Sequence, residues 1–144
     1  MLTDKNVASQ DKRARALVTG IHGFTGAYVA KELENLGFEV FGTSFAEEPT
    51  DSKITRVDLR NIKSVQNLLE DIQPEVVIHL AAVSFVGHED VSEMYEMNIV
   101  GTRNLLSALA NLTVKPKSVV LASSANIYGN STFDPISESA PVKP

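Results

Sequence analysis

The sequence contains no cysteine, and its 144 residues include only three histidines. Without cysteine the chain can form neither a disulfide nor a zinc–thiolate site, and it has no thiol nucleophile. The histidines are scattered, so no metal site is expected. Residues 1–15 mix acidic and basic side chains without a long apolar run, which predicts a polar arm and not a signal peptide or membrane span. These absences fit a protein of the cytoplasm.

Positive charge is also scarce relative to negative charge. The 13 lysine and arginine residues are outnumbered by 18 aspartate and glutamate residues, which gives a net charge of -5 and a pI of about 5.1. Such a chain has no field that attracts nucleic-acid phosphates or an anionic membrane surface, so neither partner is expected. Hydrophobic residues make up 43% and charged residues 22%, as in ordinary folded proteins, and the length suits one domain.

Short apolar runs alternate with longer segments of helical period, which is the pattern of a parallel sheet connected by helices. Strands are predicted at residues 16–19, 38–43, 53–57, 75–80 and 118–122. Residues 75–80 read EVVIHL, and this nearly continuous apolar run predicts a central strand buried on both faces. The stretch from Ser123 onward is rich in turn-forming residues and predicts loop to the end of the chain.

Four helices are predicted in all, and three of them are placed between these strands. The first is expected to end at Gly37, and its apolar face is predicted at Ala27, Ala30, Leu33 and Leu36. The second begins after Asn61, whose side chain should cap it, and ends before Pro74. The third is expected over residues 91–111.

Glycines recur every three residues where the first predicted strand meets the first helix. Gly20 can adopt a tight turn, Gly23 lets the backbone approach a pyrophosphate, and Gly26 lets the helix pack closely against the sheet. The start of the helix offers free N–H groups and a positive dipole end to phosphates. Three spaced glycines alone fit a plain turn about equally well, but their place in a βαβ unit favours dinucleotide binding.

Five motifs, in order, resemble those of the extended short-chain dehydrogenases/reductases, a family of nucleotide-sugar epimerases, dehydratases and reductases. They are TGIHGFTG at 19–26, VDLR at 57–60, HLAA at 79–82, MNIVGT at 97–102 and SSANIYGN at 123–130. The stretches HLAAVSFV and SSANIYG are most similar to the branch that contains GDP-mannose 4,6-dehydratase and GDP-4-keto-6-deoxymannose reductase. The resemblance implies a Rossmann-type doubly wound parallel sheet of about five strands over residues 16–144. This domain would bind NAD(P) and stop before the family's last strands and substrate-binding region.

The resemblance also implies which residues contact the cofactor. Asp58 would accept a hydrogen bond from the adenine amino group, and Leu59 would flank that ring with its backbone, although Asp58 could equally be a surface residue. Asn98 lies near the active site in the family, or else only ties its helix to a neighbouring strand. Ala81 and Ala82 would let the backbone lie against the cofactor, unless they serve packing alone. The implied cofactor residues are Gly20, His22, Gly23, Phe24, Gly26, Ser44, Asp58, Leu59, Leu80, Ala81, Ala82, Asn98, Ala122 and Ser123.

For the chemistry, the resemblance implies that Ser124 is the catalytic serine, bound to the sugar hydroxyl or ketone that exchanges hydride with the nicotinamide. The fifth strand delivers Ser124 to the carboxyl edge of the sheet, where ligands of open α/β folds bind. The plainer interpretation is turn chemistry in a serine-rich loop. Ser84 and Asn126 are candidate substrate contacts.

The family's general acid/base is a tyrosine followed four residues later by a lysine, which stabilises the phenolate. None of Tyr28, Tyr95 and Tyr128 has a lysine at that spacing, and the family places the pair just beyond Pro144. The chain by itself is therefore expected to bind cofactor weakly and to turn over nothing. Asn126 stands where the dehydratases carry a glutamate, which favours a 4-keto-sugar reductase or epimerase over a GDP-mannose 4,6-dehydratase-like lyase.

The choice of cofactor depends on the end of the second strand, where NAD-specific folds present an acidic residue to the ribose 2′-hydroxyl. Ser44 stands there, and its small side chain tolerates a 2′-phosphate, which slightly favours NADP over NAD. No arginine stands beside it, however, and Glu47 or Glu48 could bind a hydroxyl instead.

Three functions stay open on the sequence. The first is the NAD(P)-binding portion of a nucleotide-sugar oxidoreductase whose substrate is a nucleoside-diphosphate hexose. The second is a non-catalytic dinucleotide-binding or sensing module of the same fold. The third is a purely structural domain, whose stability NADPH would not change. An exposed fifth strand at the sheet edge predicts a homo-oligomer.

Overall fold

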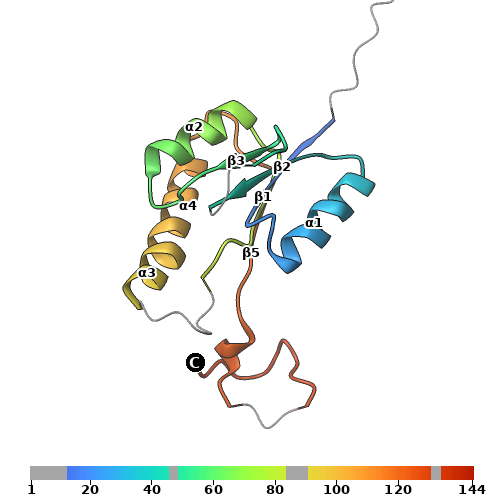
Figure 1. The fold of residues 1–144 in the computed structure, drawn as a ribbon. Coiled ribbons are helices and arrows are strands. Elements are labelled where there is room, and N and C mark those ends of the chain that lie inside the picture. Colours follow the sequence, from blue (N-terminus) through green and yellow to red (C-terminus); the bar gives the residue numbers. More distant parts are fainter. Residues whose placement is uncertain (1–12, 46–48, 84–90, 131–133) are drawn as a thin grey trace, which may run out of the picture.

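The computed structural model describes residues 13–45, 49–83, 91–130 and 134–144. Five parallel strands form one sheet with helices on both faces, which confirms the predicted doubly wound α/β class (Figure 1). The strands are β1 (Arg15–Thr19), β2 (Glu39–Ser44), β3 (Ile54–Arg56), β4 (Val76–His79) and β5 (Ser118–Leu121). The helices are α1 (Phe24–Asn35), α2 (Ile62–Ile72), α3 (Val91–Tyr95), the π-helical segment η1 (Glu96–Gly101), α4 (Thr102–Asn111) and the short 3-10 helix η2 (Ala125–Tyr128).

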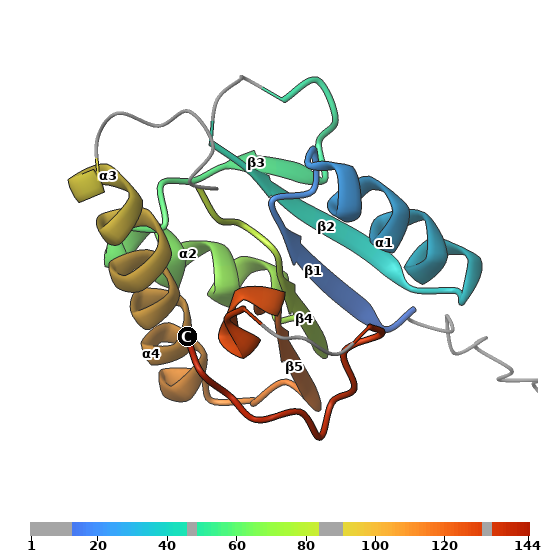
Figure 2. The ribbon, with the colours of Figure 1, turned by 90° about the horizontal axis from the view of Figure 1, so that it is seen from below.

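The strand order is β3-β2-β1-β4-β5, so the chain winds outward from β1 in both directions. Figure 2 shows α1 on one face of the sheet and α2, α3 and α4 on the other. β1 and β4 are neighbours, and their register pairs Thr19 with His79, the last residue of each strand. The strand order reverses between these two strands, and ligands of open α/β sheets bind at the carboxyl edge of such a switch point.

The hydrophobic core lies between the sheet and the layer that α2 and α4 form. Its fully buried side chains are Leu17, Val65, Leu69, Val77 and Leu105. The run predicted as the central strand is β4, an interior strand between β1 and β5. The middle of the sheet is instead β1, because both halves of the fold start from it.

The apolar face of α1 agrees with the predicted one only in part. The predicted Ala30 and Leu33 are half-buried, whereas the predicted Ala27 and Leu36 are exposed, and Gly26 is buried in their place. The close packing of Gly26 against the turn after β1 accounts for this difference. It directs toward the sheet the helix face that carries Gly26 and the residues three and four positions after it.

β5 forms the edge of the described sheet, and all four of its residues are exposed, as predicted. After β5 the chain extends away from the α/β body (Figure 1). The prediction that this stretch has no regular structure is wrong for Ala125–Tyr128, which form η2 because Ser124 caps them. In the part of the chain that the structure describes, no helix is long and apolar enough to cross a membrane.

Candidate functional site

The turn between β1 and α1 depends on two glycines. Gly20 has a φ of +71°, a left-handed conformation that glycine adopts without strain, and a Cβ there would lie 3.0 Å from the backbone of Ala81. At Gly26 a Cβ would overlap the carbonyl oxygen of Gly20 and crowd the backbone of Ile21. α1 therefore approaches the end of β1 more closely than any side chain at Gly26 would allow.

The N-terminus of α1 has no side-chain cap, because its N-cap residue is Gly23 in an extended conformation. α2 begins differently: Oδ1 of Asn61 accepts hydrogen bonds from the N–H groups of Lys63 and Ser64 at 3.1 and 3.2 Å, which confirms the predicted cap. The first N–H groups of a helix have no partner within it. At the start of α1 they are left for an anion, which the positive end of the helix dipole also favours.

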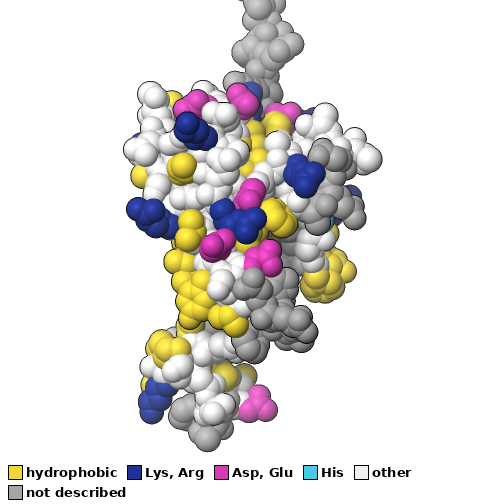
Figure 3. Space-filling model, turned by 60° about the vertical axis from the view of Figure 1, so that its left-hand side comes forward, with side chains coloured by type: hydrophobic (Ala, Val, Ile, Leu, Met, Phe, Trp, Pro, Cys, Tyr) yellow, Lys and Arg dark blue, Asp and Glu magenta, His cyan; other side chains and the backbone are white. Residues whose placement is uncertain are grey.

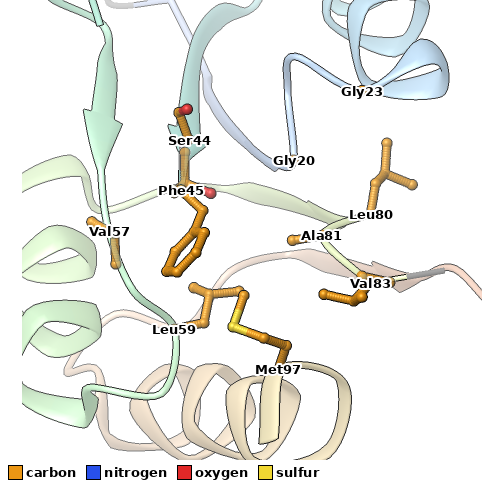
Figure 4. Close-up of a pocket in the computed structure, with 12 residues that line it drawn as sticks. Gly20, Gly23, Ser44, Phe45, Val57, Leu59, Leu80, Ala81, Val83 and Met97 are labelled. Atoms are coloured by element: carbon orange, nitrogen blue, oxygen red, sulfur yellow. The ribbon is translucent and has the colours of Figure 1, made fainter. Parts of the chain in front are cut away.

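A pocket of about 310 Å³ opens beside this turn, at the carboxyl ends of the strands. Figure 4 shows the side chains of Phe45, Leu59 and Met97 gathered on one side and residues 80–83 on the other. The lining residues are Gly20, Gly23, Thr43, Ser44, Phe45, Val57, Leu59, Leu80, Ala81, Ala82, Val83 and Met97. A concave and mostly apolar site at the switch point of an α/β sheet is typical of cofactor binding.

Asp58 is bound to Arg60 beside this pocket. The guanidinium donates from Nε to Oδ1 at 3.0 Å and from Nη2 to Oδ2 at 2.9 Å. This pairing lowers the pKa of the Asp58 carboxyl. The neighbours Val57 and Leu59 line the pocket, whereas Asp58 does not. The acceptor predicted for an adenine amino group is therefore engaged by a cation of its own chain.

Arg60 also links the pocket wall to the helical layer. Its guanidinium carbon lies 5.5 Å from the ring centroid of Phe45, and Nη1 lies 3.5 Å from a carboxylate oxygen of Glu96. Asn104 of α4 donates from Nδ2 to the carbonyl oxygens of Leu59 and Arg60 at 3.0 and 2.8 Å. These contacts hold the segment after β3 against the helices.

Asn98 lies in η1 and binds the backbone of Val83 at two points. Its Nδ2 donates to the carbonyl oxygen at 2.9 Å, and its Oδ1 accepts from the N–H at 2.8 Å. Val83 lines the pocket, as does Met97, whereas Asn98 does not. Of the two roles considered for Asn98, the structure shows a tie between the helix and the backbone after β4.

Thr19 and His79 are buried polar residues at the ends of β1 and β4 beside the pocket, and no role was predicted for either of them from the sequence. Thr19 is fully buried and His79 is 5% exposed. Oγ1 of Thr19 lies 2.7 Å from Nδ1 of His79, and Nε2 of His79 lies 2.8 Å from Oγ1 of Thr102. Burial lowers the pKa of His79, which favours the neutral imidazole. The sequence feature that could have identified them is a polar residue at the last position of each of two apolar strands.

The residues predicted to act from the fifth strand lie outside the pocket lining. The N–H of Ala122 donates to the carbonyl oxygen of the last β4 residue at 3.0 Å, so strand pairing continues past β5 toward the edge where the pocket opens. Oγ of Ser124 accepts from the N–H of Asn126 at 3.2 Å. Ser123, Ser124 and Asn126 are exposed. Ser84, the other predicted substrate contact, lies outside the described residues.

The pocket thus brings together only part of the predicted set. From that set it contains Gly20, Gly23, Ser44, Leu59, Leu80, Ala81 and Ala82. His22 and Phe24 are exposed and do not line it. The lining residues that were not predicted from the sequence are Thr43, Phe45, Val57, Val83 and Met97. Each of these is adjacent in sequence to a residue that was predicted. Among the residues described, no cluster of three or more histidine, aspartate or glutamate side chains could hold a metal ion.

Comparison with known sequences agrees with the resemblance drawn from the motifs. The family model described as the NAD dependent epimerase/dehydratase family matches residues 16–144. A GDP-6-deoxy-D-talose 4-dehydrogenase of Aggregatibacter actinomycetemcomitans is 38% identical over 131 residues, which cover 90% of this chain and 42% of that protein. A UDP-glucose 4-epimerase of Bacillus subtilis is 33% identical over 142 residues, which cover 88% of this chain and 41% of that protein.

Solved structures share the fold. A UDP-glucose 4-epimerase from Brucella ovis in complex with NAD superposes with a TM-score of 0.78 at 28% identity, covering 91% of this chain and 42% of that one. The enzyme from Stenotrophomonas maltophila, with bound NAD and formylated UDP-arabinopyranose, has a TM-score of 0.77 at 25% identity and covers 91% and 43%. The chain spans about two-fifths of the length of these relatives. By its parallel sheet, its glycine turn and the family match over residues 16–144, the chain belongs to the NAD dependent epimerase/dehydratase family.

Proposed function

We propose that this chain is the cofactor-binding part of a nucleotide-sugar oxidoreductase and holds a nicotinamide dinucleotide in the pocket beside the glycine turn. One observation carries the proposal: Gly20, Gly23, the uncapped start of α1 and an apolar pocket meet at the switch point of the sheet. Gly23 lines the pocket with backbone alone, so a pyrophosphate can come close to the first N–H groups of α1. The residues present therefore fit the group.

The pocket lining offers a separate surface to each half of a dinucleotide. Phe45, Leu59 and Met97 offer apolar surface to an adenine ring, and residues 80–83, two of which are alanines, offer backbone and apolar side chains to the nicotinamide half. When bound, a nicotinamide ring supplies the acceptance and return of hydride. The chain's own residues bind and orient the cofactor, and the apolar wall excludes water.

Within this proposal the cofactor is NAD. A 2′-phosphate needs a free cation near the end of β2. The cation to consider is Arg60, which contacts the ring of Phe45, the residue that follows Ser44 at the end of β2. The charge of Arg60 is already balanced by Asp58 and Glu96, so a phosphate would meet two carboxylates as well as the guanidinium.

Two further points support NAD over the slight preference for NADP that Ser44 alone suggested. In the sequence Glu47 and Glu48 follow the second strand, where a carboxylate repels a phosphate and can accept a hydrogen bond from a 2′-hydroxyl. The relatives from Brucella ovis and Stenotrophomonas maltophila hold NAD.

For the whole protein the proposed reaction is hydride transfer at C4 of a nucleoside-diphosphate hexose, as a 4-keto-sugar reductase or an epimerase. The names of the 4-dehydrogenase and 4-epimerase relatives support this substrate class. Ser124 accepts a hydrogen bond from Asn126, which leaves its own proton free to donate to a sugar oxygen. Ser84 and Asn126 are the proposed sugar contacts, and an amide at Asn126 disfavours the elimination of water.

A non-catalytic binding or sensing module is the second candidate. The observation that favours it is the pocket lining, in which no described residue titrates. Such a pocket binds and orients a ligand, and proton transfer would need groups from outside the lining.

Self-association is also proposed, because the exposed residues of β5 present an open strand edge.

Titrations with NADH and, separately, with NADPH test the proposal. The wild-type protein should bind NADH saturably, more tightly than NADPH, and each should raise its thermal stability. Gly23→Val should weaken NADH binding at least about tenfold, because the new side chain narrows the approach to α1. Even its Cβ would lie 3.2 Å from the Gly20 oxygen. Ala27→Val, at an exposed position further along α1, is the matched control and should bind as the wild type does. Absent binding by the folded wild type, or equal binding by Gly23→Val, contradicts the proposal.

A further inference from the structure

We propose that His79 is a positioning residue for the cofactor pocket. It joins the strand that carries the glycine turn to helix α4, and it thereby fixes the backbone of residues 80–83, which line the pocket. This inference rests on the proposed function, since the segment matters to the cofactor only if the pocket holds one.

The hydrogen bonds around His79 have one consistent direction. Oγ1 of Thr19 accepts from the N–H groups of Leu80 and Ala81, each at 3.1 Å. A hydroxyl oxygen has two acceptor sites and one proton, so the Thr19 proton is left to donate to Nδ1 of His79 at 2.7 Å. The ring proton is then on Nε2, which donates to Oγ1 of Thr102 at 2.8 Å. The geometry assigns a neutral His79 in the Nε2–H tautomer.

Burial raises the free-energy cost of losing any of these hydrogen bonds. Thr19 is fully buried and His79 is 5% exposed, so water cannot readily replace a lost partner, and an unsatisfied group carries its full desolvation penalty. A second ring proton would sit on Nδ1, opposite the hydroxyl proton of Thr19, and would break the arrangement. The lowered pKa of His79, caused by burial, agrees with the neutral ring.

Both ends of this hydrogen-bond chain reach the pocket wall. At one end Thr19 holds the first two N–H groups of the segment 80–83. At the other end Thr102 begins α4 directly after η1, in which Asn98 holds the last residue of the same segment. His79 connects the two holders, so its loss should loosen the segment from both sides.

Three substitutions at His79 separate the two arms. His79→Asn keeps an acceptor near the position of Nδ1 but does not reach Thr102. His79→Gln reaches toward Thr102 and leaves the Thr19 hydroxyl without its acceptor. His79→Leu removes both bonds. We expect the dissociation constant for NADH to rise about tenfold for Leu, nearly as much for Gln and least for Asn, because the Thr19 arm contacts the segment directly.

Val65→Ala is the matched control for a loss of stability. Val65 is fully buried in the core and does not line the pocket, so its truncation should destabilise the fold and leave the NADH dissociation constant unchanged. All titrations are made at a temperature where every variant is folded. An unchanged dissociation constant in His79→Leu, or an equal rise in Val65→Ala, overturns the proposal.

A second measurement needs neither cofactor nor a His79 variant. Long-range ¹H–¹⁵N correlation spectra of the wild-type imidazole at pH 7.5 should show a protonated Nε2 and a bare Nδ1. Thr102→Val should shift the Nε2 signal, and Thr102→Ser, which keeps the hydroxyl, should restore it. An Nδ1–H tautomer or a doubly protonated ring overturns the proposal. Failure of the wild type to bind NADH overturns the proposed function itself, a result distinct from equal binding by wild type and His79→Leu.

Discussion

Gly26 has no room for a side chain, because a Cβ there would overlap the carbonyl oxygen of Gly20. Gly26→Ala should therefore push α1 away from the sheet and lower the free energy of unfolding by about 2 kcal/mol, as overpacking typically does. Urea denaturation followed by circular dichroism measures it. Gly23→Ala is the control, because its extended conformation suits alanine and its Cβ meets the Gly20 oxygen at 3.2 Å. Equal losses in both variants would contradict the close approach at Gly26.

His79 links stability to pH. Burial lowers its pKa in the folded state below the ordinary value of 6.5, so the unfolded chain takes up a proton on this residue at a higher pH than the folded chain does. The free energy of unfolding should therefore fall as the pH drops from about 7 toward the folded-state pKa. His79→Gln, which does not titrate, should show a shallower slope in urea unfolding between pH 5 and 8. Identical slopes for the two proteins would argue against a buried neutral His79.

Glu96 is expected to influence the choice between NAD and NADP. Its carboxylate lies 3.5 Å from Arg60 Nη1, and Glu96→Gln removes one of the charges that balance the guanidinium. The ratio of NADPH to NADH dissociation constants should fall by about threefold, a modest change because the pair is partly exposed. Glu34→Gln, on the exposed side of α1, should leave the ratio unchanged. If Glu96→Gln leaves the ratio unchanged, Arg60 does not influence the group bound at the ribose 2′ position.

For single residues, the sequence predicted the features that depend on local backbone conformation. Gly20 and Gly26 follow from the strand-to-helix turn, and Asn61 follows from its place before an apolar period. The pairing of Asp58 with Arg60 and the contact of Thr19 with His79 were not predicted. The second contact depends on the register between two strands 60 residues apart, which no local pattern contains.

Among the elements, α2 has a cap whose contribution can be isolated. Asn61→Ala removes the acceptor of two N–H groups and should lower the free energy of unfolding by about 1 kcal/mol. Asn67→Ala, at an exposed position inside the same helix, is the control and should not destabilise, since alanine favours helix. Thermal and urea unfolding of both variants provide the comparison, and equal effects would mean that the cap contributes nothing specific.

The element boundaries and order show where periodicity is a sufficient guide. The strands and the helix over residues 91–111 were predicted within one or two residues, because the strands are short apolar runs and the helix has a long apolar period. Two of the four residues predicted on the apolar face of α1, Ala27 and Leu36, are exposed, and the close contact at Gly26 that helps to set the rotation of the helix was not part of that pattern. The π-helical segment η1 was not predicted, because its sequence has no hydrophobic period that distinguishes it from an α-helix.

In the part of the molecule that the structure describes, open apolar surface includes the edge strand β5 and the outer side of α3, η1 and α4. Figure 3 shows hydrophobic side chains gathered on that helical side. The exposed apolar residues there are Val91, Tyr95, Ile99, Val100 and Leu106. We expect the protein to self-associate in light scattering at high concentration.

Val120→Lys tests the strand edge as the site of that association. A lysine on an open edge disfavours pairing with another strand, so the average mass should fall toward the monomer. Thr113→Lys, exposed in the connection before β5, adds the same charge and should leave the mass unchanged. A wild-type protein that stays monomeric at high concentration would contradict the proposed homo-oligomer.

The fold class of the whole molecule was predictable because five motifs in order constrain it more strongly than any single element does. The site was predictable in part, at lining residues that the glycine turn, the family motifs or the end of the second predicted strand supply, such as Gly20, Leu59 and Ser44. Phe45 and Met97 come from different elements, and their meeting depends on the packing of the helical layer against the end of β2, which a single sequence does not specify.

The glycine turn and the segment after β4 are proposed to hold a nicotinamide dinucleotide together. Backbone ¹H–¹⁵N spectra recorded while NAD is titrated in test it most directly. The largest shifts should fall on residues 20–26 and 80–83, with smaller ones at Ser44 and Phe45, and β3 and the tail after η2 should not respond. Shifts confined to other surfaces, or none at saturating NAD, would contradict the account.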